Sequence, residues 1–287
     1  MGGCLRWVVA LRPEAQAVIE RYRMKPAKTG GTLFPVYVSP DKSMQLVISG
    51  PGYLNSAAAT GFLAGTRSGD SGVAAWLNFG IAGCGSFDRG RVFLGSKIEA
   101  ESSSEVWYPT AVWPKKADLE RRVIRTVDVP TTSYPGDGVL VEMEASGFYP
   151  VAVRDASLEL CQVMKVVSDD PDHSMTDLSK RTVTTLCHEA LNQADSWLGA
   201  FRSLIAEEDL QQSDPSGFEE LTGKLRFTVT EQHQLRRLLQ QWRALESDPP
   251  KACPDSAMEA EDAKACLQQI RERVHDLRHD LGASVRD

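Results

Sequence analysis

The sequence predicts an α/β fold with a mixed central sheet flanked by helices, followed by an all-helical C-terminal extension. Up to about residue 180, short and continuously apolar runs alternate with segments of helical character. Such runs are typical of strands that helices cover on both faces. From residue 181 onward, apolar residues recur only at helical spacing and no strand-like run follows. We therefore predict an α/β domain at residues 1–180 and a helical extension at residues 181–287.

The first half of the α/β domain contains three kinds of element in a regular order. "LRWVVAL" is a buried strand, and "RPEAQAVIERY" is a helix that tolerates Pro13 because the first helical turn needs no amide hydrogen there. "NSAAATGFLAG" is a helix of small residues opened by Asn55. The expected elements are a strand at 5–11, a helix at 12–22, a hairpin at 32–39 and 44–50, a helix at 55–65 and a strand at 74–80.

The second half of the domain continues this alternation around a polar middle segment. "GVLVEME" and "LELCQVMKVVSDD" are apolar runs of strand length that end in acidic residues. The expected elements are a strand at 90–102, a strand at 138–144, a helix at 145–152 and a last buried strand at 158–170.

The C-terminal extension contains only helical patterns. Residues 177–209 carry apolar residues at helical spacing, and we expect the first helix of the extension to pack on the α/β body. A polar linker at 211–217 precedes two further helices at 228–247 and 256–282, the last with Ser256 as its N-cap.

Composition excludes several classes of protein. The net charge of −7 leaves no basic face large enough for general nucleic-acid binding. The six cysteines are scattered without metal-ligand spacing, as expected for reduced thiols. Neither a GxGxxG fingerprint nor a Walker loop is present, so we expect no metal and no organic cofactor.

The sequence contains no segment that resembles a membrane span. The apolar run in the first eleven residues is too short for a signal peptide or a span, and no other stretch approaches spanning length. We expect a cytoplasmic protein with no membrane partner.

Four short motifs lie where predicted strands end. Glu14 follows the first strand, "FGIAG" ends the strand at 74–80, "VEMEA" ends the strand at 138–144, and "VVSDD" ends the last strand. Ligands of open α/β sheets bind at the carboxyl ends of strands, and buried carboxylates are costly unless something pairs with them. Taken singly, Glu14 is a helix-dipole carboxylate and Asp169 a helix cap, so only the combination predicts a binding site.

The order of these motifs resembles the nucleoside phosphorylase superfamily, and most closely its 5′-methylthioadenosine/S-adenosylhomocysteine nucleosidase branch. The resemblance covers residues 5 to 180 and implies cleavage of the bond between a purine and its ribose. It implies that Asp169, with Ser168 beside it, protonates the base, and that Glu14 activates the attacking water. Glu144 is implied to bind the ribose hydroxyls, with Met143 against the sugar.

The same resemblance implies the remaining contacts of the site. Glu142 either faces the sugar or supports the loop, and Lys165 replaces an arginine common in the family. The chemistry fits these residue types, because carboxylates stabilise the oxocarbenium-like sugar and a protonated purine leaves more readily. The glycine turn supplies the other predicted substrate-binding residues, which are Gly80, Ile81, Ala82 and Gly83.

Water is the predicted nucleophile. Asn78 and Ile81 stand where arginine and serine would help phosphate in phosphorolytic relatives, although Arg12 keeps phosphorolysis open. The predicted function is therefore hydrolysis of a 5′-modified adenosine, such as methylthioadenosine, S-adenosylhomocysteine or 5′-deoxyadenosine, with release of adenine. The alternatives are a phosphorylase acting on a specialised adenosine derivative such as adenosylhopane, and a catalytically idle nucleoside-binding or scaffold protein.

Two expectations are less specific. Tyr134 and Phe148 are candidates for the aromatic residue that stacks on the base, and each also has a purely structural interpretation. The resemblance implies a homodimer or a larger homo-oligomer.

Overall fold

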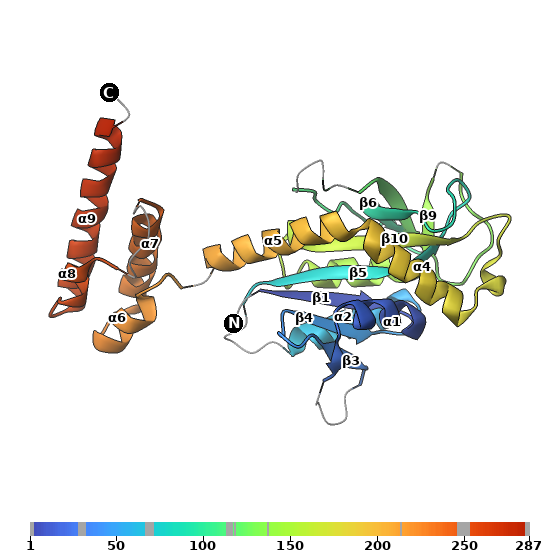
Figure 1. The fold of residues 1–287 in the computed structure, drawn as a ribbon, viewed down its shortest axis with the longest axis horizontal. Helices are drawn as coiled ribbons and strands as arrows, with labels where there is room; N and C mark the ends of the chain where they lie inside the picture. The colour runs from blue at the N-terminus through green and yellow to red at the C-terminus, as the bar shows by residue number, and fades with distance from the viewer. Residues whose placement is uncertain are drawn as a thin grey trace. The chain divides into compact units, whose positions relative to one another are not determined.

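The computed structural model of the protein forms two compact units, Met1–Gln212 and Ser213–Asp287 (Figure 1). The structure describes residues 3–27, 33–66, 72–112, 117, 119–136, 138–212, 214–245 and 253–284.

The described part of the first unit is a mixed sheet with helices on both faces, as predicted. Its strands are β1 (Cys4–Val9), β2 (Lys25–Pro26), β3 (Val36–Val38), β4 (Met44–Ile48), β5 (Ala74–Gly83), β6 (Val92–Ala100), β7 (Val106–Trp107), β8 (Arg121–Thr126), β9 (Leu140–Glu142) and β10 (Cys161–Asp169). Its helices are α1 (Arg12–Arg21), α2 (Tyr53–Gly65), α3 (Ala145–Ala152), α4 (Lys180–Gln193) and α5 (Asp195–Gln212), with short 3₁₀ turns at Leu158–Leu160 and Met175–Asp177.

Parallel pairing brings four strand ends to one edge of the sheet. β4, β1, β5 and β10 lie side by side and run in the same direction. β5 also pairs with β9 through Gly83 and Val141, so the path from β10 through β6, β8 and β9 returns to β5. Residues that follow β1, β5, β9 and β10 in the sequence therefore meet in space.

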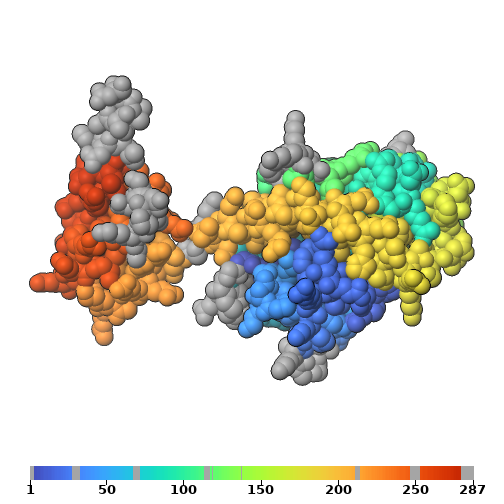
Figure 2. All heavy atoms as spheres, in the orientation of Figure 1, coloured from blue at the N-terminus to red at the C-terminus, as the bar shows by residue number. Residues whose placement is uncertain are grey.

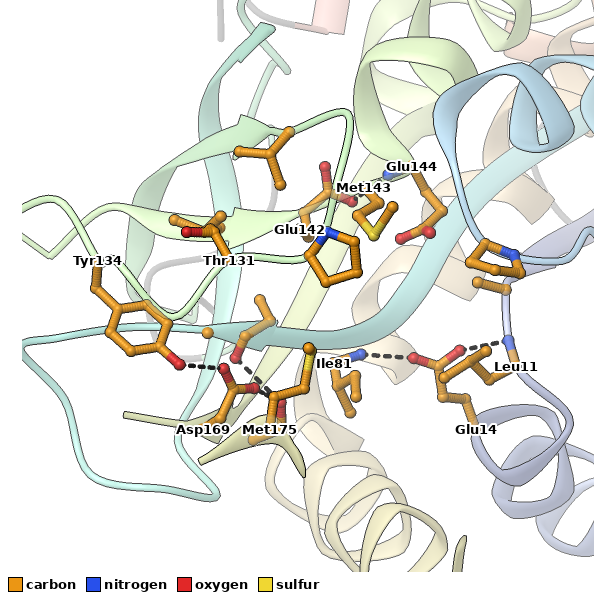
Figure 3. Close-up of a pocket in the computed structure, with 18 residues that line it drawn as sticks. Leu11, Glu14, Ile81, Thr131, Tyr134, Glu142, Met143, Glu144, Asp169 and Met175 are labelled. Carbon is orange, nitrogen blue, oxygen red and sulfur yellow. Dashed lines mark hydrogen bonds between the residues drawn. The ribbon is translucent and has the colours of Figure 1, made fainter. Parts of the chain in front are cut away.

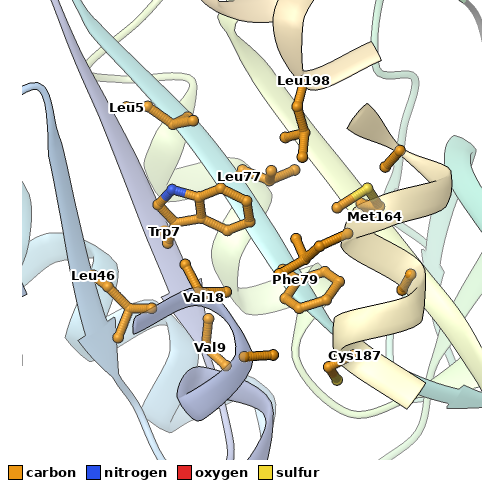
Figure 4. Packing of buried hydrophobic residues seen from close by; sticks show 14 of the residues in the cluster. Leu5, Trp7, Val9, Val18, Leu46, Leu77, Phe79, Met164, Cys187 and Leu198 are labelled. Atoms are coloured by element: carbon orange, nitrogen blue, oxygen red, sulfur yellow. The ribbon is translucent and has the colours of Figure 1, made fainter. Parts of the chain in front are cut away.

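Alternate residues of the central strands enter two separate cores. Trp7 and Val9 pack with α1, α4 and α5 on one face, whereas Val8 packs with α2 and α3 on the other. Figure 4 shows the first of these clusters, in which Trp7 lies edge-on to Phe79 with ring centroids 5.9 Å apart. Burial on both faces explains why these strands are continuously apolar in the sequence.

The predicted polar middle segment contains a strand that the sequence analysis omits. β8 pairs in parallel with both β6 and β9. Only Ile124 and Thr126 of this strand are buried, while Arg125 forms an ion pair with Glu99. A strand with charged residues on its partly exposed face lacks the apolar run that identifies its neighbours.

The boundary of the first unit differs from the predicted one. The sequence analysis ends the α/β domain at residue 180, but the compact unit extends to Gln212. α4 and α5 lie across one face of this unit and bury Leu191, Trp197 and Phe201 in its core (Figure 2). The expectation that the first helix of the extension packs on the sheet is therefore met, and the second helix does the same.

The described part of the second unit is helical. It contains α6 (Phe218–Lys224), α7 (Val229–Leu245), α8 (Asp255–Met258) and α9 (Ala263–Ser284). The predicted single helix at 256–282 is thus two helices, and Asp262 rather than Ser256 caps the long one, through its bond from the Ala265 amide. No helix in the described ranges is long and apolar enough to span a membrane.

Gly147 sets the distance between α2 and α3. A Cβ atom at this position would lie 1.9 Å from the carbonyl oxygen of Tyr53, so the two helices must separate to admit it. We expect Gly147→Ala to lower the free energy of unfolding by about 1–3 kcal/mol, the usual cost of overpacking. Denaturant unfolding followed by circular dichroism measures this, with Gly61→Ala as the control because its Cβ would meet only Val151 at 4.0 Å. Equal stability of the two variants would contradict the prediction.

Candidate active site

A hollow opens where β1, β5, β9 and β10 end (Figure 3). It encloses about 600 Å³ of empty space, including its open mouth. Its described lining consists of Ala10, Leu11, Glu14, Pro51, Ile81, Ala82, Gly83, Val127, Pro130, Thr131, Tyr134, Val141, Glu142, Met143, Glu144, Ser168, Asp169 and Met175.

Glu14 enters the hollow from the first turn of α1. The backbone amides of Leu11 and Ile81 donate hydrogen bonds to its two carboxylate oxygens, over 2.7 and 2.8 Å. Burial, reinforced by the nearby charge of Glu144, raises its pKa to about 7. A carboxyl group with this pKa can accept a proton from water near neutral pH.

Gly80 contributes space for Glu14 rather than a wall of the hollow. A Cβ atom on Gly80 would lie 2.7 Å from Oε1 of Glu14. The predicted substrate-binding role of Gly80 is therefore not supported by its position, because it does not line the hollow. The amide of the next residue, Ile81, is the group that holds the carboxylate.

Glu142 has its oxygens occupied by the protein. Its carboxylate accepts hydrogen bonds from the hydroxyl of Thr126 at 2.6 Å and from the backbone amides of Glu144 and Ala145 at 2.9 to 3.0 Å. It also pairs with Lys165, whose Nζ lies 2.7 Å away. Of the two roles predicted for Glu142, support of the loop is the one that these contacts favour.

Glu144 has fewer partners and faces the hollow. Its Oε1 accepts a hydrogen bond from the amide of Gly52 at 2.9 Å, and its Oε2 lies 3.8 Å from Nζ of Lys165. Burial raises its pKa, and the charge of Lys165 opposes that effect. Met143 lies beside it in the lining. Glu144 therefore has acceptor capacity left for a ligand.

Lys165 lies behind the carboxylates and outside the described lining of the hollow. Burial alone would lower its pKa, but Glu142 and Glu144 raise it above its ordinary value. A fully buried ammonium group between two carboxylates balances their charge. These contacts favour an indirect role for Lys165, and its predicted substrate contact stays a prediction.

Asp169 ends β10 on the opposite side of the hollow from Glu14 (Figure 3). Its side chain is buried, and its Oδ1 accepts a hydrogen bond from the hydroxyl of Ser168. Its Oδ2 accepts one from the hydroxyl of Tyr134 at 2.5 Å.

The structure brings together most of the predicted site residues. Phe148 belongs to the core between the sheet and α3, so of the two aromatic candidates only Tyr134 reaches the hollow. The sequence analysis omits the segment at residues 127–131 and Met175, which have no motif that would identify them. The predicted residues in the lining are Glu14, Ile81, Ala82, Gly83, Glu142, Met143, Glu144, Ser168 and Asp169.

Removal of the buried ammonium group of Lys165 tests whether it balances the charge of Glu142. We expect Lys165→Met to lower the free energy of unfolding by about 3–5 kcal/mol, because it leaves Glu142 buried without its counter-charge. Denaturant unfolding followed by circular dichroism measures this loss. The double variant Glu142→Gln, Lys165→Met should recover part of it, and a double variant as unstable as the sum of both single changes would refute the pairing.

Comparison with known proteins finds solved structures that are similar to this one. No protein-family model and no curated protein matches the sequence. The structure is similar to the 5′-methylthioadenosine nucleosidase of Arabidopsis thaliana, with 14% identity, 74% of this chain and 99% of that chain covered, and a TM-score of 0.56. It is similar to a mutant 5′-methylthioadenosine/S-adenosylhomocysteine nucleosidase of Helicobacter pylori holding 5′-methylthioadenosine, with 16% identity, 72% and 100% covered, and a TM-score of 0.52.

A third similar structure has a different substrate in its name. The futalosine hydrolase of Helicobacter pylori shares 14% identity over 69% of this chain and 97% of that chain, with a TM-score of 0.51. At these identities the comparisons establish the fold. The chain therefore has the fold of these nucleosidases, which agrees with the fold that the motifs predict.

Proposed function

We propose that this chain, which has the fold of these nucleosidases, hydrolyses the N-glycosidic bond of a purine nucleoside. The observation that carries the proposal is the convergence of three buried carboxylates on one hollow. Glu14, Glu144 and Asp169 come from segments about 130 and 25 residues apart, and all three line the same space. Buried carboxylates without a ligand would be costly, so their convergence supports a binding and catalytic role.

Each carboxylate suits one step of the reaction. Asp169, in its protonated form, donates a proton to a ring nitrogen of the base, so that the purine leaves as a neutral molecule. Glu144 accepts hydrogen bonds from the ribose hydroxyls, and its negative charge stabilises the positive charge that develops on the sugar. Glu14 accepts a proton from the water that attacks the anomeric carbon. The water oxygen bonds to that carbon as the bond to the base breaks.

The charges around the hollow support water over phosphate as the nucleophile. Among its described lining residues there is no arginine or lysine. Arg12, which kept phosphorolysis open, lies over the ring of Tyr37 at 4.9 Å, and the side-chain amide of Asn78 donates to the carbonyl of Val8. Charged donors bind phosphate strongly, and these positions direct none into the hollow.

The substrate that we propose is a 5′-modified adenosine. Two of the similar structures are named for 5′-methylthioadenosine, and one of them holds that compound in its active site. The lining of the hollow here includes Leu11, Pro51 and Met175, whose apolar side chains suit a thioether better than a charged group.

A panel of nucleosides tests this proposal. 5′-Methylthioadenosine, S-adenosylhomocysteine, 5′-deoxyadenosine, adenosine and futalosine are each incubated with the full chain, with and without phosphate, and free base is measured. We expect adenine from the first three without phosphate, together with a free sugar. Strict dependence on phosphate and a sugar 1-phosphate product would identify a phosphorylase instead. Absence of base release from every compound, with or without phosphate, would favour a nucleoside-binding protein without activity.

A further inference from the structure

The hydroxyl group of Tyr134 donates a hydrogen bond to the carboxyl group of Asp169, which we assign as the acid. It lies 2.5 Å from Oδ2 of Asp169, and burial raises the pKa of the phenol, together with the hydrogen bond to Asp169 and the charge of that residue. Figure 3 shows the ring approaching Asp169 from the side of the hollow that is away from Glu14. The proposed reaction has no use for this contact.

Two glycines provide the space for the tyrosine ring. A Cβ atom on Gly83 would lie 2.4 Å from Cε1 of Tyr134, and one on Gly85 would lie 3.1 Å from its Cβ. The ring therefore lies directly against the backbone at the end of β5. That position is next to Asp169, where the purine base must lie to receive the proton of the acid.

Both oxygens of Asp169 are engaged by hydroxyl donors. Ser168, which is fully buried, donates to Oδ1, and Tyr134, which is half-buried, donates to Oδ2. The bond from Tyr134 occupies Oδ2 of Asp169, and a base must displace it to receive a proton from that oxygen.

The position of Tyr134 in the chain permits it to move. It lies in the segment between β8 and β9, whose described residues 127–136 form no helix or strand. The side chain is half-buried, in contrast to the fully buried Ser168 on the other oxygen. Of the two contacts, the one with Tyr134 is therefore the one that a ligand can replace.

We propose that Tyr134 is a displaceable latch on Asp169, which occupies Oδ2 of the acid until a purine base takes its place. The inference rests on the proposed function and adds a gating residue to it. A base that enters the hollow breaks the bond from Tyr134, and Oδ2 of Asp169 then faces the base. The apparent affinity for substrate is lowered by the fraction of protein in which the latch is closed.

Tyr134→Phe tests the latch by steady-state kinetics on 5′-methylthioadenosine. The change removes the hydroxyl and keeps the ring, so we expect KM to fall by about ten-fold, the value of one hydrogen bond to a charged group, without loss of kcat. Tyr108→Phe is the matched control, because it makes the same change at an exposed tyrosine outside the lining of the hollow. An unchanged KM, or a fall in kcat, would overturn the latch.

Fluorine NMR of protein containing 3-fluorotyrosine tests the contact without turnover. The resonance missing from Tyr134→Phe identifies Tyr134 among the six tyrosines. We expect this resonance to shift when Asp169→Asn removes the carboxylate, and again when adenine is added to the wild-type chain. A resonance unmoved by Asp169→Asn would overturn the latch whatever the activity.

The experiments distinguish failure of the latch from failure of the proposed function. No base release by the wild-type chain or by Tyr134→Phe, on any nucleoside, would reject the proposed function. In that case an adenine-induced shift of the Tyr134 resonance would still support displacement of the latch, and no shift at saturating adenine would reject it. Base release by the wild-type chain together with a Tyr134 resonance that adenine does not move would reject the latch alone.

Discussion

Asp169→Asn is expected to lower kcat for 5′-methylthioadenosine by about 10²–10⁴-fold, the usual contribution of a positioned general acid. Asparagine keeps the size of the side chain and can still accept a hydrogen bond at one of the two positions that Ser168 and Tyr134 face, but it has no acidic proton for the base. The measurement is the initial rate of adenine release at saturating substrate. The purine would then have to leave as an anion, which is the slow step that protonation avoids.

Asp170→Asn is the matched control for this prediction. It makes the same change one residue later, at a side chain that bonds to His173 and lies outside the lining of the hollow. Its rate should remain within a few-fold of the wild-type rate. If Asp169→Asn were as active as Asp170→Asn, the acid would be a different group and the proposed mechanism would be wrong.

Glu14→Gln is expected to have the second large effect, a loss of about 10²–10⁴-fold in kcat. Glutamine cannot take a proton from water, so the nucleophile is no longer activated. Glu20→Gln is the control, since Glu20 lies on the same helix with its carboxylate bonded to Gln16 and His188 at the surface. Comparable rates in the two variants would show that Glu14 is not the base.

The pH dependence of the wild-type rate follows from the raised pKa of Glu14. A base acts only when it is ionised, so the ionisation of Glu14 should make kcat/KM rise with pH as the pH approaches about 7. The residual activity of Glu14→Gln should lack this rise. A wild-type profile already flat between pH 5 and pH 8 would contradict the assignment.

The same pKa has a consequence for stability, with a definite sign. A glutamate whose pKa is about 7 in the folded state and 4.5 in the unfolded state binds its proton more tightly when folded. The stability that this proton contributes is therefore full below pH 4.5 and is lost as the pH rises toward 7. Between pH 5 and pH 8 the wild-type chain should lose about 2 kcal/mol relative to Glu14→Gln in denaturant unfolding.

Much of the fold can be predicted from the sequence, because both faces of the central strands are buried. Val8 and Trp7 enter different cores, so most residues of such a strand are apolar and the strand is visible as a run. β8 is not visible in this way, since Arg121 and Arg125 lie on its partly exposed face. The helices α4 and α5 are recognisable as helices, but their membership of the first unit depends on which surface their apolar side chains meet.

The candidate site was predictable as a set of residues and less so as a set of roles. The motifs that end the strands identify Glu14, Glu142, Glu144 and Asp169, and all four line the hollow. Their partners come from unrelated segments, such as Gly52 for Glu144 and Thr126 for Glu142. The catalytic and binding roles themselves stay predictions until the variants above are measured.

By itself, the sequence determined the fold class and the order in which acidic residues follow the buried strands. Both are local properties, set by the hydrophobic pattern along each segment and by the residues that end it. Only the tertiary structure decided which carboxylates are free to meet a ligand: Glu142 is used by Lys165 and Thr126, Asp169 is covered by Tyr134, and Glu14 has its pKa raised. The physical reason is that burial, counter-charge and hydrogen-bond donors come from residues distant in sequence, which meet only when the sheet brings its strand ends together.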